Sequence, residues 1–270
     1  MKIGIVAIGL IGGSILKSLS QREDLEIFVV SRNLQSLEKA KEYTNNVSTE
    51  LTSLNDCDVI FTCTPIGNTL ETLDALEPIA KKSCIVTDVS SVKEFVMKKQ
   101  RPYIFIGSHP MAGTENSGFD ASFKELFERA KWVITPSKGT PEKELHTLKS
   151  IIEIIGAKPI ICDAAKHDKA VALISHMPML ISQAIFDCAS ENDLALSLAS
   201  SGFRDMTRLA MSNTNMANDM LIYNKENIEK ACDDMILSLN KLSGENYHEM
   251  ISEIKSSREK MYSKEGKNLL

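Results

Sequence analysis

Two polar segments that could carry chemistry follow short apolar runs of this 270-residue chain. His109 comes after the run at residues 103–107, and Ser91 follows a second run that ends at Asp88. An imidazole is suited to take a proton from a substrate hydroxyl near neutral pH. We therefore expect His109 to follow a strand directly and to face a cleft. A structural histidine at a strand end is the alternative.

A glycine-rich turn follows the first apolar run, residues 2–6. It has the G-x-G-x-x-G pattern with Ala7 at the first position, and it leads into a helical pattern. Such a turn brings backbone amides and a helix N-terminus to a pyrophosphate, although a turn without a ligand is the alternative. Because a left-handed alanine costs about 1–2 kcal/mol, we expect a negative φ at Ala7. The residues predicted to line the dinucleotide site are Gly9, Leu10, Ile11 and Gly12.

The end of the second apolar run indicates which dinucleotide binds. Enzymes that use NAD place an acid there, on the ribose 2′-hydroxyl. This chain has Ser31 and Arg32 instead, with no carboxylate. A hydroxyl followed by a guanidinium suits a 2′-phosphate, so we predict NADP rather than NAD. A surface arginine on a turn is the alternative.

These residues need a scaffold, and the first 163 residues supply one by alternating apolar runs with helical patterns at residues 34–43 and 141–155. This alternation is typical of a doubly wound, Rossmann-like α/β fold with a mostly parallel sheet. Each run is nearly all apolar, as in strands buried on both faces. The predicted strands are residues 2–6, 26–30, 58–62, 84–88, 103–107, 132–135 and 158–161.

Residues 164–270 have no further strand-like run, and their apolar residues recur every three or four positions. We expect an all-helical second domain, with helices at residues 166–188, 224–242 and 245–262 and a kink or break at Pro178. Its apolar surplus predicts a homodimer formed through this domain. Packing of the helices against the chain's own sheet is the alternative.

Composition excludes several classes of function. With 31 Lys and Arg against 36 Asp and Glu, the chain has no basic footprint for nucleic acid or for an anionic membrane. There is no N-terminal signal pattern and no unbroken apolar run of about 18 residues, so we expect a cytoplasmic protein. The six cysteines contain no C-x-x-C pair and are interpreted as reduced thiols, and no metal site is predicted.

From residue 1 to about 225 the chain resembles the prephenate/arogenate dehydrogenases of tyrosine biosynthesis. The histidine-containing and the arginine-containing segments are the most specific. The segments that carry the resemblance are Gly-Leu-Ile-Gly-Gly-Ser (9–14), Cys-Thr-Pro (63–65), Asp-Val-Ser-Ser-Val-Lys (88–93), Gly-Ser-His-Pro-Met-Ala-Gly-Thr-Glu (107–115), Ser-His-Met-Pro (175–178) and Ser-Ser-Gly-Phe-Arg-Asp-Met-Thr-Arg (200–208).

The resemblance implies a dinucleotide-binding domain, a helical dimerisation domain and the oxidative decarboxylation of a small anionic cyclohexadienol. It implies that His109 takes the proton of the ring hydroxyl and that Ser91 orients this hydroxyl. It implies that Arg208 binds the ring carboxylate. The remaining residues matched are Thr64 and Pro65 at the cofactor and His176, Thr114 and Glu115 at the substrate pocket.

The residues alone leave other interpretations open. Arg204 and Arg208 are compatible with a solvated helix face, and His176 with a core histidine beside Pro178. Ser31 and Arg32, together with residues 200–208, most resemble the NADP-dependent members acting on arogenate, for which Glu115 is a candidate discriminating residue. A β-hydroxyacid or imine reductase of similar architecture, and an NADP-sensing protein without chemistry, are the competing functions.

Overall fold

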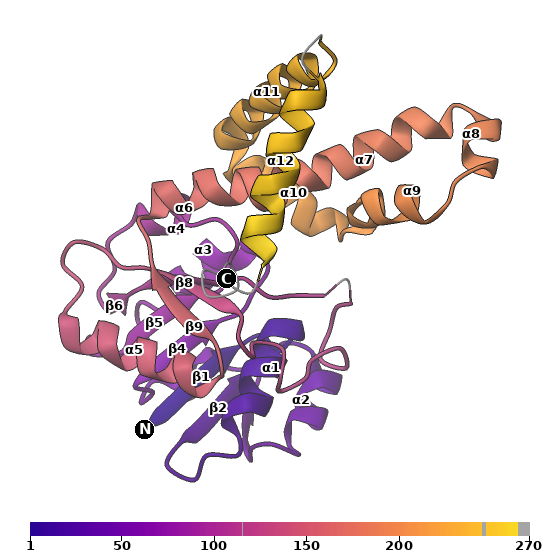
Figure 1. Cartoon of the computed structure of the whole chain (residues 1–270). Helices are drawn as coiled ribbons and strands as arrows, with labels where there is room; N and C mark the ends of the chain where they lie inside the picture. Colours follow the sequence, from indigo (N-terminus) through magenta and orange to yellow (C-terminus); the bar gives the residue numbers. More distant parts are fainter. Residues whose placement is uncertain (115, 245–246, 264–270) are drawn as a thin grey trace.

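The first half of the chain forms a six-stranded parallel sheet covered by helices (Figure 1). The computed structural model of the chain describes residues 1–114, 116–244 and 247–263. The strand order is β3-β2-β1-β4-β5-β6, which reverses between β1 and β4, the place where open α/β sheets bind ligands. The predicted doubly wound fold is therefore confirmed. The strands are β1 (Lys2–Val6), β2 (Glu26–Val30), β3 (Asn46–Ser48), β4 (Val59–Thr62), β5 (Ile85–Asp88) and β6 (Ile104–Phe105).

Helices pack on the sheet in two hydrophobic cores. Helices α1 (Leu10–Leu19), α2 (Leu34–Ala40) and α5 (Glu142–Ile154) belong to one core, in which Ile15, Leu16 and Leu19 of α1 are completely buried. Helix α3 (Ile66–Ala75) and the short α4 (Glu94–Met97) belong to the other core, and the short helix η1 (Leu51–Leu54) precedes β4. The two cores hold the carboxyl ends of β1, β4 and β5 at one edge of the sheet.

A second, smaller sheet contains β7 (Gly107–Pro110), β8 (Lys131–Thr135) and β9 (Lys158–Ile161). The predicted single strand at 103–107 is wrong, because the chain leaves the first sheet after Ile106 and pairs antiparallel with β8 from Gly107 onward. A Cβ on Gly107 would lie 2.5 Å from Thr135 Oγ1, so glycine permits this crossing. Pro110 is tolerated since β7 is an edge strand. Strand β9 is half exposed, with Ile161 52% exposed, rather than buried on both faces.

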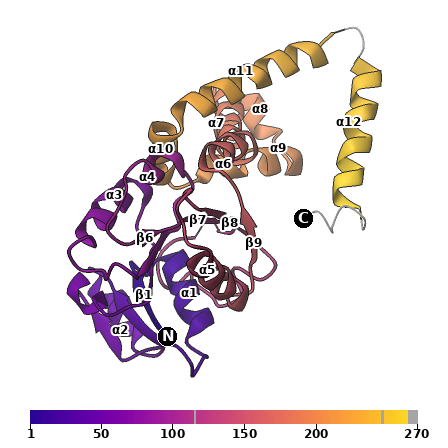
Figure 2. The ribbon, with the colours of Figure 1, turned by 90° about the vertical axis from the view of Figure 1, so that its left-hand side faces the viewer.

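The rest of the chain is helical, as predicted, and forms a separate layer above the sheets (Figures 1 and 2). Pro178 lies in the first turn of α7, where proline is tolerated, and the break in regular geometry is the π-helical turn immediately before it. The helices are α6 (Ala164–Val171), the π-helical η2 (Ala172–His176), α7 (Met177–Ser190), α8 (Asp193–Ser197), α9 (Ser201–Met206), η3 (Arg208–Met211), α10 (Thr214–Tyr223), α11 (Lys225–Leu242) and α12 (Tyr247–Tyr262).

Two carboxylates of the helical layer cap helices of the sheet layer. Asp168 accepts hydrogen bonds of 2.8 Å from the backbone amides of Lys93 and Glu94, at the start of α4. Asp219 accepts one of 2.9 Å from the amide of Gly67, at the start of α3. Since free amides at a helix start favour an anion, these contacts fix the helical layer over the carboxyl edge of the sheet.

One helix of the described residues, Ala164–Ser190, is long and apolar enough to cross a membrane by length and composition, with a mean hydropathy of 1.4. Unbroken apolar runs in the sequence do not reveal it, because serine, histidine and glutamine interrupt them. A third of its apolar window is buried in the chain (33%), and a helix buried in a protein core passes the same test, so this is weak evidence for a membrane span.

Candidate active site

The turn between β1 and α1 has the geometry of a dinucleotide-binding turn. The prediction of a negative φ at Ala7 is wrong: its φ is +66°. The Ala7 amide still extends the β1–β2 ladder by donating to Val30 O at 2.8 Å. A left-handed residue then turns the chain into α1 and brings Ala7 O over Gly12, where a Cβ would lie only 2.1 Å from that oxygen. Close turn-to-helix contact therefore outweighs the strain of a left-handed alanine.

The residues of this turn fit an anionic dinucleotide. A Cβ built on Gly9 meets no atom within 4 Å, so its backbone borders open space. The first turn of α1, which begins with Leu10 and Ile11, has neither a side-chain cap nor an acidic residue, which leaves its amides for an anion. Beyond the end of β4, Thr64 Oγ1 is buried without a partner in the described chain, next to Pro65 at the start of α3.

Ser31 and Arg32 lie at the carboxyl end of β2, directly beside β1. Ser31 is nearly buried, and its Oγ accepts a 3.2 Å hydrogen bond from the amide of Asn33, the residue that caps α2. Arg32 is exposed, and it makes no hydrogen bond or ion pair with any residue the structure describes. The strand end therefore presents one free guanidinium.

A buried polar network joins β5 to β7 beneath the site. The Lys93 ammonium bonds to the Asp88 carboxylate and donates to Ser108 O at 2.6 Å, and both charged side chains are fully buried. Ser108 in turn donates through its amide to Asp88 Oδ1 at 3.1 Å and through its Oγ to Asp88 O at 2.7 Å. This network fixes the Ser91 loop relative to the strand that carries His109.

His109 lies within β7, paired with Val133, and not after a strand as predicted, because the chain has already entered the second sheet. Its Nδ1 is 2.9 Å from His167 Nε2, and His167 Nδ1 is 2.7 Å from Asp168 Oδ1. Burial, and then the neighbouring His167, Lys93 and His176, keep the pKa of His109 well below its usual value. The ring is therefore neutral near neutral pH and able to accept a proton.

Two further predicted residues present unsatisfied polar atoms. Ser91 Oγ and His176 Nε2 are buried and have no hydrogen-bond partner in the described chain. His176 is fully buried, and Asn224 Nδ2 lies 3.1 Å from its Nδ1 and donates at 2.9 Å to Asp168 O. Burial lowers the pKa of His176 to about 4. Because the Asn224 amide is a donor, the proton of the neutral ring lies on Nε2, ready for an acceptor.

The structure thus brings His109 and His176 into one hydrogen-bonded cluster through His167, Asp168 and Asn224. It shows no direct contact between this cluster and Arg208, which is exposed at the start of η3, a short helix packed on α7. Thr114 is exposed after β7, where its Oγ1 accepts a 3.3 Å hydrogen bond from the Asn116 amide. Glu115 lies outside the described residues.

Four residues of the cluster carry no role in the sequence interpretation: Lys93, His167, Asp168 and Asn224. Lys93 ends a motif segment, but nothing in its sequence neighbourhood shows that it is buried. His167 and Asp168 are adjacent titratable residues in α6, which is the local signal that could have identified them. Their partners are 58 and 75 residues away in the chain.

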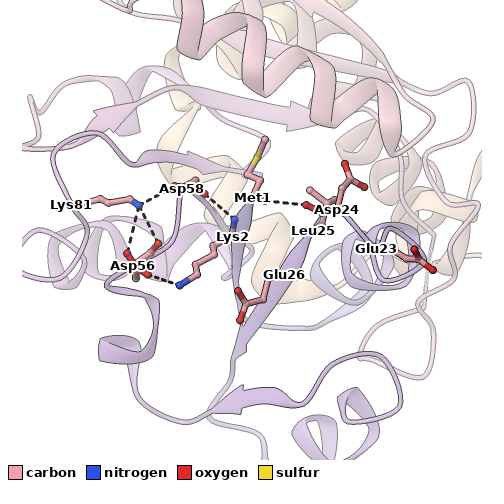
Figure 3. A pocket seen from close by; sticks show the side chains of 9 residues that line it. All are labelled: Met1, Lys2, Glu23, Asp24, Leu25, Glu26, Asp56, Asp58 and Lys81. Atoms are coloured by element: carbon pink, nitrogen blue, oxygen red, sulfur yellow. Dashed lines mark hydrogen bonds and ion pairs between the residues drawn. The ribbon is translucent and has the colours of Figure 1, made fainter.

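A surface pocket at the opposite, amino-terminal edge of the sheet holds no comparable chemistry (Figure 3). Two of its carboxylates are paired with lysines: Lys2 Nζ lies 2.5 Å from Asp56 Oδ2, and Lys81 Nζ lies 2.9 Å from Asp58 Oδ1. Ligands of open α/β sheets bind at the carboxyl edge. The candidate site is therefore the histidine cluster, which the Lys93 network joins to the carboxyl end of β5.

Comparison with known proteins identifies the family of the chain. The family "Prephenate dehydrogenase, nucleotide-binding domain" matches residues 18–161, and "Prephenate dehydrogenase, dimerization domain" matches residues 163–258. The cyclohexadienyl dehydrogenase of Zymomonas mobilis is 29% identical over 253 residues, which cover 89% of this chain and 86% of that protein.

Two crystal structures are similar over almost their whole length. Arogenate dehydrogenase from Synechocystis is 35% identical, with a TM-score of 0.85 over 96% of this chain and 99% of that one. Prephenate dehydrogenase from A. aeolicus, in complex with hydroxyphenyl propionate and NAD+, is 30% identical, with a TM-score of 0.86 over 96% and 97%. The chain belongs to the prephenate/arogenate dehydrogenase family of NAD(P)-dependent oxidoreductases.

Proposed function

We propose that the chain oxidatively decarboxylates arogenate, prephenate or both, with NADP as the preferred cofactor. The observation that carries this proposal is the neutral His109 imidazole, next to the Ser91 loop and in one cluster with His176. Family membership supports a dehydrogenase of this class over a hydroxyacid reductase or a sensor without chemistry.

In this proposal each site residue has its own role in the reaction. A bound nicotinamide dinucleotide supplies the hydride acceptor. His109 Nε2 takes the proton of the ring hydroxyl while the carbinol carbon gives up its hydride, and Ser91 Oγ orients that hydroxyl. The ring carboxylate leaves as carbon dioxide, and its bonding electrons complete the aromatic ring. Arg208 binds that carboxylate as a planar, bidentate donor, and the His176 Nε2–H donates to a second polar group of the substrate.

A steady-state comparison of prephenate and arogenate, each with NAD and with NADP, tests the reaction directly. We expect a phenolic product and carbon dioxide from at least one substrate. The variant His109→Asn should bind the cofactor normally and lose turnover by about 100-fold or more. Unchanged turnover would exclude His109 as the base, and no phenolic product from either substrate would exclude the reaction.

The preference for NADP rests on the unpaired guanidinium of Arg32 and on the lack of a carboxylate at the end of β2. A charge-assisted hydrogen bond contributes about 1.5–3 kcal/mol, so Arg32→Ala should lower kcat/KM for NADP by roughly 10- to 100-fold and leave that for NAD unchanged. Arg22→Ala is the matched control, since Arg22 is exposed and pairs with Asp24 before the start of β2. A native preference for NAD would contradict the assignment.

Within this proposal the two layers have separate tasks. Residues 1–163 bind the dinucleotide, and residues 164–270 provide Arg208 and His176 and pair two subunits into a homodimer. The family match to a dimerization domain over residues 163–258 supports the pairing. Thr114 and Glu115 are proposed to border the substrate pocket, with Glu115 as the candidate for recognising the amine of arogenate.

A further inference from the structure

We infer that His167 and Asp168 are positioning residues that fix the tautomer of His109 and share its positive charge once it has taken a proton. The inference rests on the proposed role of His109 as the base. It adds two residues that the family resemblance did not suggest.

Asp168 is held as a carboxylate acceptor. Its Oδ1 accepts from the Lys93 amide at 2.8 Å and lies 2.7 Å from His167 Nδ1, and its Oδ2 accepts from the Glu94 amide at 2.8 Å. It is 1% exposed and His167 is 3% exposed, so water does not compete for these contacts. The two backbone amides are donors, so both oxygens of the Asp168 side chain must accept hydrogen bonds. A carboxylate does this with both of its oxygens.

The tautomers of both rings follow from this acceptor. Because the Asp168 carboxylate cannot donate, the His167 proton lies on Nδ1. His167 Nε2 is then a lone pair, and it can pair with His109 Nδ1 at 2.9 Å only if His109 carries its proton on Nδ1. The lone pair of His109 is therefore on Nε2, which makes no hydrogen bond with any residue that the structure describes and is free for a substrate hydroxyl. These contacts therefore leave His109 Nε2 as the nitrogen that can accept a proton.

The same contacts account for the proton after transfer. When the substrate O–H bond breaks, an N–H bond forms at His109 Nε2, and the ring becomes an imidazolium. Its Nδ1 proton can then pass to His167 Nε2, which leaves a neutral His109 and an imidazolium on His167 beside the Asp168 carboxylate. Among the described residues, His167, Lys93 and His176 act electrostatically on His109, and the Asp168 carboxylate contacts His167, so the charge moves toward that carboxylate. No electrons are exchanged in this step.

A merely structural role makes a different prediction. Asp168 would cap α4 whatever stood at position 167, and His167 would serve only to fill space. In that case the tautomer of His109 would not depend on residue 167, and an isosteric apolar ring there would preserve turnover. The two roles are therefore separable by changing His167 and leaving Asp168 in place.

The first measurement uses the unmodified protein with 15N-labelled histidine. We expect NMR to show His109 protonated on Nδ1 and unprotonated on Nε2 at pH 8. An Nε2–H tautomer of His109 would overturn the inference without any variant.

The second measurement compares three variants at pH 8. His167→Phe should shift His109 toward the Nε2–H tautomer and lower kcat by about 100-fold, with KM for the cofactor unchanged. His167→Gln, whose amide oxygen can accept from His109 Nδ1, should retain the native tautomer and recover part of the turnover. His146→Phe, at an exposed position of α5, is the matched control and should behave as the parent.

A native kcat in folded His167→Phe would overturn the inference. A failure of this inference can be distinguished from a failure of the proposed function by comparing His167→Phe with His109→Asn. If His109→Asn keeps its turnover, His109 is not the base and the proposed function fails. If His109→Asn is inactive and His167→Phe is fully active, only the positioning role fails.

Discussion

At the residue scale, Lys93 joins the segments that carry the two candidate catalytic residues, because its ammonium bonds to Asp88 and to Ser108 O. It is fully buried with Asp88, and burial lowers its pKa. Lys93→Met leaves the Asp88 carboxylate buried without its cation, which should cost about 3–5 kcal/mol in the free energy of unfolding. Chemical denaturation in urea measures this loss.

The double variant Asp88→Asn/Lys93→Met tests whether the unpaired Asp88 carboxylate causes this loss of stability. It removes both charges, so it should be more stable than Lys93→Met alone, since a buried pair contributes less than the penalty of breaking it. Lys39→Met, which removes an exposed partner of Asp120, should change stability little. Equal destabilisation by Lys39→Met and Lys93→Met would contradict the buried-pair account.

Two buried histidines should make stability depend on pH. Burial lowers the pKa of His176 to about 4 and keeps that of His109 well below its usual value. In the unfolded chain both titrate near 6.5, so between about pH 6.5 and pH 4 the unfolded state binds more protons than the folded state. Stability is therefore complete above about pH 6.5 and falls toward pH 4, by up to about 1.4 kcal/mol per pH unit for each histidine.

Urea midpoints between pH 7.5 and pH 5 measure this slope. His176→Asn removes one of the two groups and should flatten the dependence, whereas His146→Asn on the exposed side of α5 should not alter it. An unchanged slope in His176→Asn would show that His176 does not contribute.

At the element scale, the turn from β1 into α1 carries strain that a single substitution can release. Ala7 has a φ of +66°, where a Cβ costs about 1–2 kcal/mol. Ala7→Gly should raise stability by up to about 1 kcal/mol, because part of the gain is offset by the greater freedom of glycine in the unfolded chain. Thermal unfolding measures the difference, and cofactor affinity should stay the same.

Ala199→Gly provides the comparison, since Ala199 is exposed in a loop and has no positive φ. This variant should be slightly less stable than the parent. If Ala7→Gly were destabilised to the same extent as Ala199→Gly, the turn would not be strained.

The elements also show what sequence can predict here. Apolar runs locate β1 and β2 at their observed bounds, because strands of a parallel sheet are buried on both faces. They miss β3, whose three residues include Asn46 and Ser48. They join β6 to Gly107, because apolar character does not reveal which sheet a segment pairs with. The φ of Ala7 was also not predictable from the sequence, because it is set by the contact between Ala7 O and Gly12 and not by the conformational preference of alanine.

The candidate site was predictable in its parts but not in its connections. His109, Ser91 and His176 stand out in the sequence because of residue type and position in motifs. The Asp168 carboxylate that joins α4 to His167 cannot be identified this way, since its partners at the start of α4 lie 74 and 75 residues away along the chain. Long-range polar contacts of this kind depend on how the helical layer docks on the sheet.

At the scale of the whole molecule, the helical layer leaves a large apolar surface uncovered. Ile236 and Leu239 of α11 are 55% and 58% exposed, and no described residue of α12 is buried. Figure 2 shows α12 standing apart from the rest of the chain, running back from the far end of α11. Monomeric proteins rarely expose so much contiguous apolar surface, so this face is where we expect the second subunit.

The double variant Ile236→Glu/Leu239→Glu should separate the subunits. Burying a leucine or isoleucine side chain contributes about 1.5–3 kcal/mol, so introducing two carboxylates at the interface should raise the dissociation constant by at least about 100-fold. Light scattering over a range of concentrations measures the mass. Ile154→Glu, at an exposed apolar position of α5 on the sheet layer, should leave the dimer intact. A monomeric parent chain would contradict the predicted dimer. A double variant that remains dimeric would exclude this face, because an interface that buries these side chains cannot tolerate two unpaired charges.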